Sequence, residues 1–398
     1  MARLYGKINL MRKAFCIFIL AAASGLLGCS SVPLRGKSDF IDKMLYRRVH
    51  YRASGDYRQI GLFYASCRQI REAGGNLTFS PALSGRLTAG TFDCRINPRL
   101  KIGKVIPEDL KGQKVVTVHN IKKISDSDFI NELSGAVNSS PHKSLLVLIY
   151  GFKDDFEMTA IKAGYFTYLL DIDTPVLLFD WPGDQPVAPW GYGKAVSLAQ
   201  SSGAYLGQAL ARIIREVKPK KLWIESSSLG CQVVCSAFEW MYKQPDLADP
   251  VPEMAHVVMS APDVARGEYG EDFKNEVLAL TDKVTAYVSS NDTALLMAGI
   301  IKGEKEYGLQ DSKITKQDQF NEAKGLLYLK AQAPDKISIV DVTPINRASY
   351  HHGYDLEAPE FYDDFYMRLF DVPAHNNRRL YIVNVDKNVD YWIMRSDW

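Results

Sequence analysis

Residues 221–231 read Lys-Leu-Trp-Ile-Glu-Ser-Ser-Ser-Leu-Gly-Cys, an apolar run that ends in three serines and a glycine. The run predicts a buried strand, the serines predict a tight turn, and the pattern of residues 231–242 predicts a helix. A serine at such a turn stands clear of its neighbours, and the next backbone N–H points toward whatever the serine attacks. The spacing Ser226-x-Ser228-x-Gly230 departs from the usual G-x-S-x-G only at its first position. The stretch predicts either a nucleophile turn centred on Ser228 or a serine-rich loop after an ordinary buried strand.

The composition of the whole chain narrows the classes of protein. Its 398 residues suit one large α/β domain with additions, or two domains. The net charge is +2 from 48 basic and 46 acidic residues, and there is no basic tract, which argues against nucleic acid as the main partner. No Cys/His spacing resembles a zinc site, and we expect neither a metal nor another cofactor.

The amino-terminal segment has the pattern of an export signal. Lys7, Arg12 and Lys13 precede an apolar run at residues 14–27, and Gly28 follows it. A positive region, a short apolar region and small residues before a cleavage point are typical of a secretory signal. The run is too short for a comfortable transmembrane helix.

The next residue, Cys29, directly follows Leu-Leu-Gly, which resembles the end of a bacterial lipoprotein signal. The resemblance implies cleavage before Cys29 and attachment of lipid to its thiol, and several acyl chains on one residue anchor a protein durably. Ser30 after the cysteine favours the outer membrane, facing the periplasm. The alternatives are an ordinary signal peptide and a retained anchor, and Met11 could be the true start.

The other cysteines have simpler interpretations. Cys231 and Cys235 are four apart on a helix, a poor spacing for a disulfide, and we expect them to pack as small hydrophobes. An exported compartment would permit a bond between Cys67 and Cys94.

The order of apolar runs predicts the fold. Strands expected at residues 60–65, 86–96 and 115–119 make an antiparallel front, followed by a helix at 126–137 with Ser125 as its N-cap. Strands then alternate with helices: strands at 145–149, 176–179, 222–224, 257–259, 284–288 and 337–340, and helices at 157–169, 195–217, 231–242, 311–336 and 357–370. Such alternation predicts a mostly parallel, doubly wound α/β sheet with helices on both faces. Residues 379–398 add an extra strand or arm.

A serine nucleophile needs a base and a carboxylate that orients the base. In a doubly wound sheet these groups collect at the carboxyl ends of the strands, in the chain order Ser, acid, His. Asp292 lies one short loop after the strand at 284–288 and is the predicted acid, although it could instead cap the next helix. Asp263, after the preceding strand, is the rival.

Two adjacent histidines, His351 and His352, follow the last core strand and precede the closing helix. Neighbouring side chains in an extended loop point in opposite directions, so only one can reach Ser228. Gly353 lets the loop bend beside His352, which we predict to be the base. The alternative is a surface pair without a role. We expect His256, at the start of an apolar run, to be structural.

The predicted oxyanion hole has two backbone donors. One is the N–H of Leu229, and the other is the N–H of Phe152, in the loop after the strand at 145–149. Gly151 allows a sharp turn there, and Tyr150 stands where histidine is common. Residues 181–192 are aromatic and rich in proline, and they could line the pocket or pack as a surface loop.

Several of these motifs together resemble the α/β-hydrolase superfamily, and most of all a bacterial branch of uncharacterised lipoprotein-like α/β hydrolases. They occur in the order Phe-Tyr-Ala-Ser-Cys-Arg at 63–68, Tyr-Gly-Phe at 150–152, Trp-Pro at 181–182, Ser-Leu-Gly at 228–230, Ala-Pro-Asp at 261–263, the segment 287–295 and His-Gly-Tyr at 352–354. The resemblance covers residues 60–370. It implies that Ser228 is the nucleophile, Asp292 the acid and His352 the base. Departures from the motifs at Tyr150, Ser226 and Ser227 remove no triad member, but they touch the pocket floor.

These observations lead to one expected organisation and function. We expect a lipoprotein signal peptide at residues 1–28, a tether and first helix at 29–57, an α/β-hydrolase domain at 58–372 and an extension at 373–398. The expected function is that of a membrane-anchored serine hydrolase that cleaves an ester, or an amide, of a small molecule or a lipid through an acyl-enzyme. The contrasting hypothesis is a catalytically silent hydrolase fold that serves the envelope as a binding or scaffold lipoprotein.

Overall fold

The structure is a computed structural model of the chain, and it describes residues 52–98, 100, 112, 114–247, 251–264, 274–289, 333, 335–347, 352–386 and 389–396. All of them belong to one compact unit, Leu45–Trp398. The signal peptide with Cys29, the predicted acid Asp292, His351 and most of the expected helix at 311–336 lie outside the described residues.

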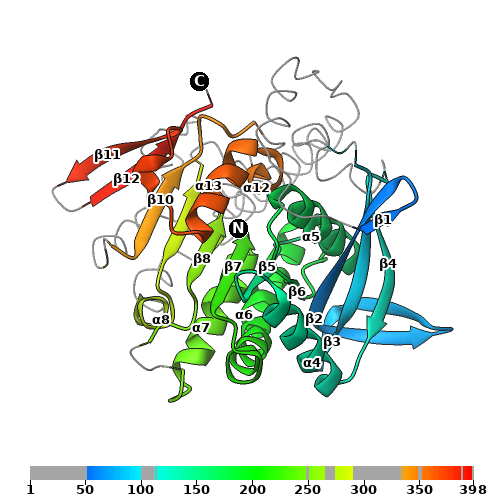
Figure 1. Cartoon of the computed structure of the whole chain (residues 1–398). Helices are drawn as coiled ribbons and strands as arrows, with labels where there is room; N and C mark the ends of the chain where they lie inside the picture. The colour runs from blue at the N-terminus through cyan, green and yellow to red at the C-terminus, as the bar shows by residue number, and fades with distance from the viewer. Residues whose placement is uncertain are drawn as a thin grey trace, which may run out of the picture. The chain divides into compact units, whose positions relative to one another are not determined.

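One sheet of twelve strands organises this unit (Figure 1). Its order is β11-β12-β10-β9-β8-β7-β5-β6-β2-β3-β4, with β1 beside β2. The strands are β1 Arg52–Ser54, β2 Tyr57–Ala73, β3 Asn76–Ile96, β4 Val116–Lys123, β5 Ser144–Ile149, β6 Val176–Asp180, β7 Lys221–Ser227, β8 His256–Ser260, β9 Val284–Val288, β10 Ile337–Asp341, β11 Leu380–Asp386 and β12 Val389–Met394.

The pairing confirms a mostly parallel sheet with an antiparallel front. From β2 through β6, β5, β7, β8, β9 and β10 to β12, every neighbouring pair is parallel. The pairs of β1 and β3 with β2, of β4 with β3 and of β11 with β12 are antiparallel. Figure 1 shows the two antiparallel parts at opposite ends of the sheet, β2 to β4 in blue and cyan and the hairpin of β11 and β12 in red.

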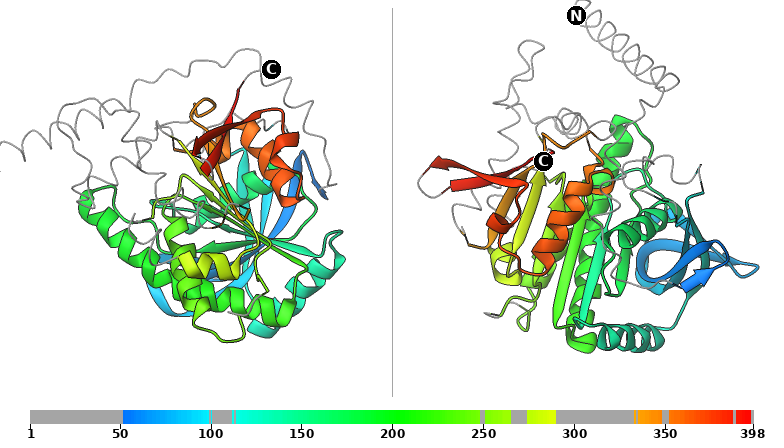
Figure 2. Two further views of the ribbon diagram at one scale, coloured as in Figure 1. Left: turned by 90° about the vertical axis from the view of Figure 1, so that its left-hand side faces the viewer. Right: turned by 45° about the horizontal axis from the view of Figure 1, so that its top comes forward.

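Helices cover both faces of the parallel strands (Figure 1, Figure 2). One core includes side chains of α4 Asp126–Ser139, α6 Pro189–Arg212, α7 Gly230–Tyr242 and α8 Lys274–Leu280. The other includes side chains of α5 Phe156–Leu170, α12 Tyr354–Glu357 and α13 Pro359–Leu369. Because both faces are covered, β5, β6 and β8 are buried at every position, which explains why their sequences are continuous apolar runs.

Two helices differ from the sequence-based expectation because of proline. The long helix α6 begins at Pro189 rather than at residue 195, and a π-helical turn, Ile213–Val217, continues it. The closing helix is two helices, α12 and α13, and Pro359 opens the second. Proline lacks an N–H and is pre-shaped for the first helical position, so it ends one helix and begins the next.

The strands of the antiparallel front are longer than expected, and the helix that follows them begins at the expected N-cap. The expected helix N-cap is confirmed, since the Ser125 hydroxyl accepts from the Asp128 N–H at 3.1 Å. The register of β3 and β4 shifts between Thr91 and Asp93, close to Gly90, where an added Cβ would meet the Lys122 carbonyl. Within the segment 29–57, the described residues start at 52 and form β1 and a turn, where the sequence suggested a tether and a first helix.

The described cysteines are all reduced and buried. Cys67 and Cys94 belong to cores on opposite faces of the sheet, so no bond forms between them. Cys231 and Cys235 pack in one core, as expected of small hydrophobes. Within the described ranges, every helix is too short or too polar to cross a bilayer.

Candidate active site

The sharpest feature of the predicted site is the turn between β7 and α7. Ser228 has φ +55°, in the left-handed region that serine rarely adopts. Its N–H donates to the Ser260 carbonyl at 2.9 Å, and its own carbonyl accepts from Cys231 and Asp263. A backbone fixed on both sides in this conformation turns the serine side chain out of the strand, as the sequence predicts for a nucleophile turn.

Two glycines let the loop after β5 approach this turn. A Cβ on Gly151 would lie 2.7 Å from the Ser228 Cβ and 3.0 Å from its Oγ. A Cβ on Gly230 would lie 2.6 Å from the Ile149 carbonyl oxygen. Only glycine fits at either position, and the Ser228 hydroxyl therefore lies against the backbone of residue 151.

Three of the nine non-glycine residues with positive φ in the described part of the chain lie at this edge of the sheet. Lys153 after β5, Ser228 after β7 and Ala261 after β8 have φ values of +75°, +55° and +46°. Each such non-glycine residue costs on the order of 1–3 kcal/mol and persists where the surroundings enforce it, typically at functional sites. The carboxyl ends of these strands therefore form a candidate active site.

The two predicted oxyanion donors lie beside Ser228. Leu229 leads into α7, so its N–H belongs to the first helical turn, whose amides have no partner within the helix. Phe152 follows Gly151, and its ring contacts Tyr192 of α6 edge-on at a centroid distance of 5.7 Å. The segment 181–192 thus packs on the loop after β5 and, through Phe152, borders the predicted oxyanion hole.

The structure describes only one of the two candidate acids. Asp292 lies outside the described residues, and its role stays a prediction. Asp263 is buried, its N–H donates to the Ser228 carbonyl, and its carboxylate accepts from the Tyr192 hydroxyl at 2.6 Å. That bond uses one oxygen of Asp263 to hold α6 against the turn.

The predicted base is held near the strand ends by a tyrosine two residues later. The Tyr354 hydroxyl donates to the Tyr287 carbonyl at 2.7 Å and accepts from the Ala261 N–H at 2.5 Å. These two bonds fix α12, and with it the half-buried His352, beside the ends of β8 and β9. His256 is buried instead in the sheet, where it hydrogen-bonds to Thr285 at 2.8 Å, and burial lowers its pKa to about 3. Its structural role is confirmed.

A pair of buried carboxyls escaped the sequence interpretation. Glu225 of β7 accepts from the Ser260 hydroxyl at 2.8 Å, while its Oε2 is buried without a hydrogen bond to the described residues. Asp355 of α12 is hydrogen-bonded to the Ser227 side chain. Burial raises the pKa of both groups, and the opposing effects of Ser227, Lys162 and His352 on Asp355 are smaller. A glutamate directly after the apolar run 222–224 was the available signal.

The three departures from the family motifs are accommodated locally. The Ser226 hydroxyl bonds to the Val258 carbonyl at 3.3 Å, and Ser227 reaches Asp355. Tyr150 is buried in the core on the side of α5, where its hydroxyl makes no hydrogen bond to the described residues, and its carbonyl accepts from the Trp181 indole at 2.7 Å. None of the three alters the turn at Ser228.

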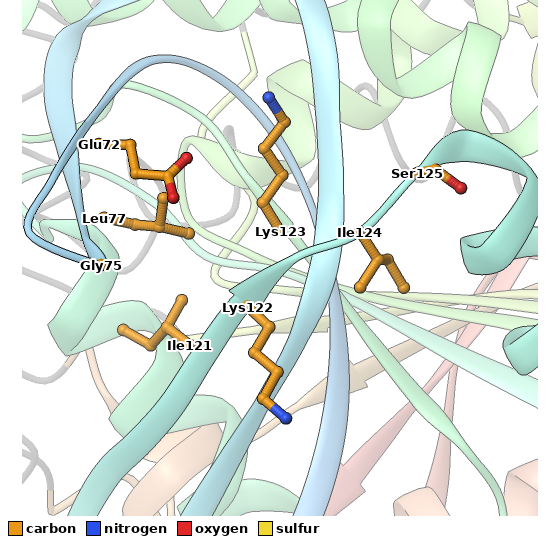
Figure 3. A pocket seen from close by; sticks show the side chains of 8 residues that line it. All are labelled: Glu72, Gly75, Leu77, Ile121, Lys122, Lys123, Ile124 and Ser125. Atoms are coloured by element: carbon orange, nitrogen blue, oxygen red, sulfur yellow. The ribbon is translucent and has the colours of Figure 1, made fainter.

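A separate hollow of about 440 Å³ lies beside the turn that joins β2 and β3 (Figure 3). Its lining residues come from β2, β3 and their turn, from β4 and from the connection to α4, and none comes from the loops around Ser228. Figure 3 shows Lys122 and Lys123 pointing away from each other, so their charges do not converge on one ligand. In the part of the chain that the structure describes, no three His, Cys, Asp or Glu side chains gather closely enough to bind a metal ion.

A parallel sheet covered on both faces, with a strained serine between strand and helix at its carboxyl edge, defines the class of α/β hydrolases. The chain belongs to the family described as alpha/beta hydrolase of unknown function (DUF900), whose model matches residues 125–369. No curated protein matches the chain.

Among solved structures, the chain is similar to the Pyrococcus furiosus esterase Pf2001, at 10% identity over 72% of this chain and 84% of that one, with a TM-score of 0.34. It is also similar to phospholipase PlaB from Legionella pneumophila, solved in complex with thio-NAD, at 10% identity over 63% and 67% of the two chains, with a TM-score of 0.26.

Proposed function

We propose that the protein is a serine hydrolase that cleaves an ester or an amide through an acyl-enzyme. The observation that carries the proposal is Ser228, held at φ +55° with its hydroxyl against Gly151. A left-handed serine costs stability, and such strain is typical of a nucleophile turn between a strand and a helix. The family and the fold supply the hydrolase class, and the serine chemistry is our inference from the turn.

The proposed reaction has two steps. Ser228 Oγ attacks the carbonyl carbon while His352 takes its proton, and the N–H groups of Leu229 and Phe152 donate to the developing oxyanion. The carbon–oxygen bond to the leaving group then breaks, and His352 returns the proton to that group. In the second step His352 takes a proton from water, whose oxygen attacks the acyl carbon. The bond between that carbon and Ser228 Oγ then breaks, His352 returns the proton to Oγ, and the acid leaves. Asp292 is the proposed partner that orients His352.

Apolar side chains support an acyl substrate from a small molecule or a lipid. Phe152 and Tyr192 pack beside the predicted oxyanion hole. In the same segment, Val187 and Trp190 are 80% and 77% exposed. Aromatic and aliphatic walls bind acyl chains by burial of apolar surface.

The proposed location is the bacterial envelope, through lipid on Cys29 and most consistent with the outer membrane facing the periplasm. Its support is the sequence pattern at residues 7–30. Mass spectrometry of the protein from a native membrane fraction should find a processed and acylated Cys29. An unmodified Cys29 or an intact amino terminus would overturn this part of the proposal.

A fluorophosphonate probe tests the serine chemistry directly, because it forms a covalent bond only with an activated serine. The wild type and Ser227→Ala should be labelled, and Ser228→Ala should not. Ser227 is the matched control, since it is the adjacent residue in the same turn. Well-folded wild type that takes no probe and cleaves no short-chain ester would instead support a silent scaffold.

A further inference from the structure

We propose that Arg68, on strand β2 of the antiparallel front, is a positioning residue that holds the loop of the oxyanion hole in its active shape. The inference rests on the proposed function, which it extends to a residue outside the triad. It concerns the two loops after β5 and β6, residues 150–155 and 181–185, which together form the wall next to Ser228.

Arg68 is completely buried and uses its whole guanidinium group. Its Nε donates to both carboxylate oxygens of Asp180 at 2.9 Å, and its Nη1 pairs with Asp184. Its Nη2 donates to the carbonyl of Asp154 at 3.1 Å. Ser66 completes the arrangement by donating to Asp180 at 2.6 Å. One side chain from β2 therefore joins the end of β6, the loop after β6 and the loop after β5.

The two loops are also hydrogen-bonded to each other, so a displacement of one loop displaces the other. The Lys153 N–H donates to the Gly183 carbonyl at 2.8 Å, and the Trp181 indole donates to the Tyr150 carbonyl at 2.7 Å. These bonds lie on either side of Phe152, the proposed oxyanion donor. Gly183 is so close that an added Cβ would lie 2.8 Å from the Gly151 carbonyl oxygen.

The charges explain why arginine is needed at this position. Asp180 and Asp184 bring two negative charges to a site where Asp180 is fully buried, and Arg68 is the cation bonded to both. Breaking a buried pair leaves an uncompensated charge, which is strongly destabilising. Lysine keeps the charge but has no planar fork, so it cannot contact Asp180, Asp184 and the Asp154 carbonyl together. Without that fork the loop around Phe152 loses its tie to β2.

A matched control exists farther along the sheet, beside β9 and β10. Arg368 of α13 is also buried, and its Nε donates to Asp364 at 2.6 Å. Its Nη1 donates to Thr285 and Ser338, and it makes no hydrogen bond to the loops at 150–155 and 181–185. Arg368→Lys therefore disturbs a similar buried ion pair without touching the proposed oxyanion hole.

The test compares full-length wild type, Arg68→Lys and Arg368→Lys on a short-chain p-nitrophenyl ester, with the active fraction counted by fluorophosphonate labelling. We expect kcat of Arg68→Lys to fall about 10- to 100-fold with KM nearly unchanged, because a misplacement of about 1 Å can cost about 10²-fold. The inhibition constant of a boronic acid, which forms a tetrahedral adduct on the serine, should rise in parallel. Arg368→Lys should unfold at a lower temperature with kcat per labelled site unchanged.

A second variant covers the case in which Arg68→Lys does not fold. Asp184→Asn removes one negative charge, and Arg68 keeps its bond to Asp180. We expect a smaller fall in kcat than in Arg68→Lys, again with KM unchanged. A wild-type kcat in Arg68→Lys would overturn the role of Arg68 and leave the serine chemistry intact. If Arg68→Lys is unfolded, a wild-type kcat in Asp184→Asn would do the same. A wild type that is neither labelled nor active would overturn the proposed function and this role with it.

Discussion

Replacing Gly151 with alanine tests how closely the loop after β5 must approach Ser228. The new Cβ would lie 2.7 Å from the Ser228 Cβ, 3.0 Å from its Oγ and 3.1 Å from the Ser227 carbonyl oxygen. Ordinary van der Waals contact between two carbon atoms begins at 3.4 Å. The loop after β5 or the turn at Ser228 must therefore move by about 0.7 Å, the difference between 3.4 Å and the 2.7 Å that separates the two Cβ atoms. One of the obstacles is backbone, so a change of side-chain rotamer cannot relieve the overlap.

The size of that shift sets the expected loss. Since a misplacement of about 1 Å can cost about 10²-fold, we expect kcat/KM of Gly151→Ala to fall about 10- to 100-fold. Overpacking costs about 1–3 kcal/mol, so the protein should still fold. Initial rates on a short-chain p-nitrophenyl ester and thermal unfolding measure the two effects. Gly135→Ala, on an exposed part of α4 where a Cβ meets nothing within 4 Å, should keep wild-type rates. Wild-type rates in Gly151→Ala would refute the proposed geometry.

Three further predictions concern the base, the acid and a buried carboxyl. His352→Ala should lose several orders of magnitude in rate and His351→Ala should not, because triad members act as a unit; an active His352→Ala beside an inactive His351→Ala would reverse the assignment. Asp292→Asn should lose far more activity than Asp263→Asn, whose amide oxygen can still accept from α6, and equal losses would contradict the choice of acid. Burial raises the pKa of Glu225 well above its usual value of 4.5, so the folded state binds that proton more tightly than the unfolded chain and wild-type stability falls as the pH rises above about 4.5. Glu225→Gln should remove this loss, which is at most about 1.4 kcal/mol per pH unit, and urea unfolding at pH 5 and pH 8 should show a gain in stability that is larger at pH 8.

The parallel sheet was predictable because its strands are buried on both faces and their sequences are therefore continuous apolar runs. The turn at Ser228 was also predictable, because small residues, here Ser226 to Ser228 and Gly230, are needed where a buried strand turns sharply into a helix. The full length of β2 and β3 was not, because their outer parts are half-exposed and their polar residues break the alternation. The start of α6 at Pro189 was hidden within a segment that reads as a proline-rich loop.

The residues that support the site were the hardest to predict. Arg68 and Asp180 are 112 residues apart in the chain, and nothing in either local pattern names the other. Glu225 and Asp355 meet only because α12 packs against the end of β7, a tertiary contact that periodicity does not encode. Sequence patterns therefore predicted residues such as Ser228, whose type the reaction requires. They missed residues such as Arg68, whose role depends on which distant residues they contact.

The left-handed backbone at Ser228 has a consequence for any attempt to make this protein more robust. Glycine adopts that conformation freely, so a variant with glycine at position 228 should relieve strain on the order of 1–3 kcal/mol. A library ranked only by resistance to heat would therefore favour the loss of the very hydroxyl that we assign to the reaction. Stability and reactivity compete for one backbone position, and laboratory evolution of this fold must select for turnover and durability together.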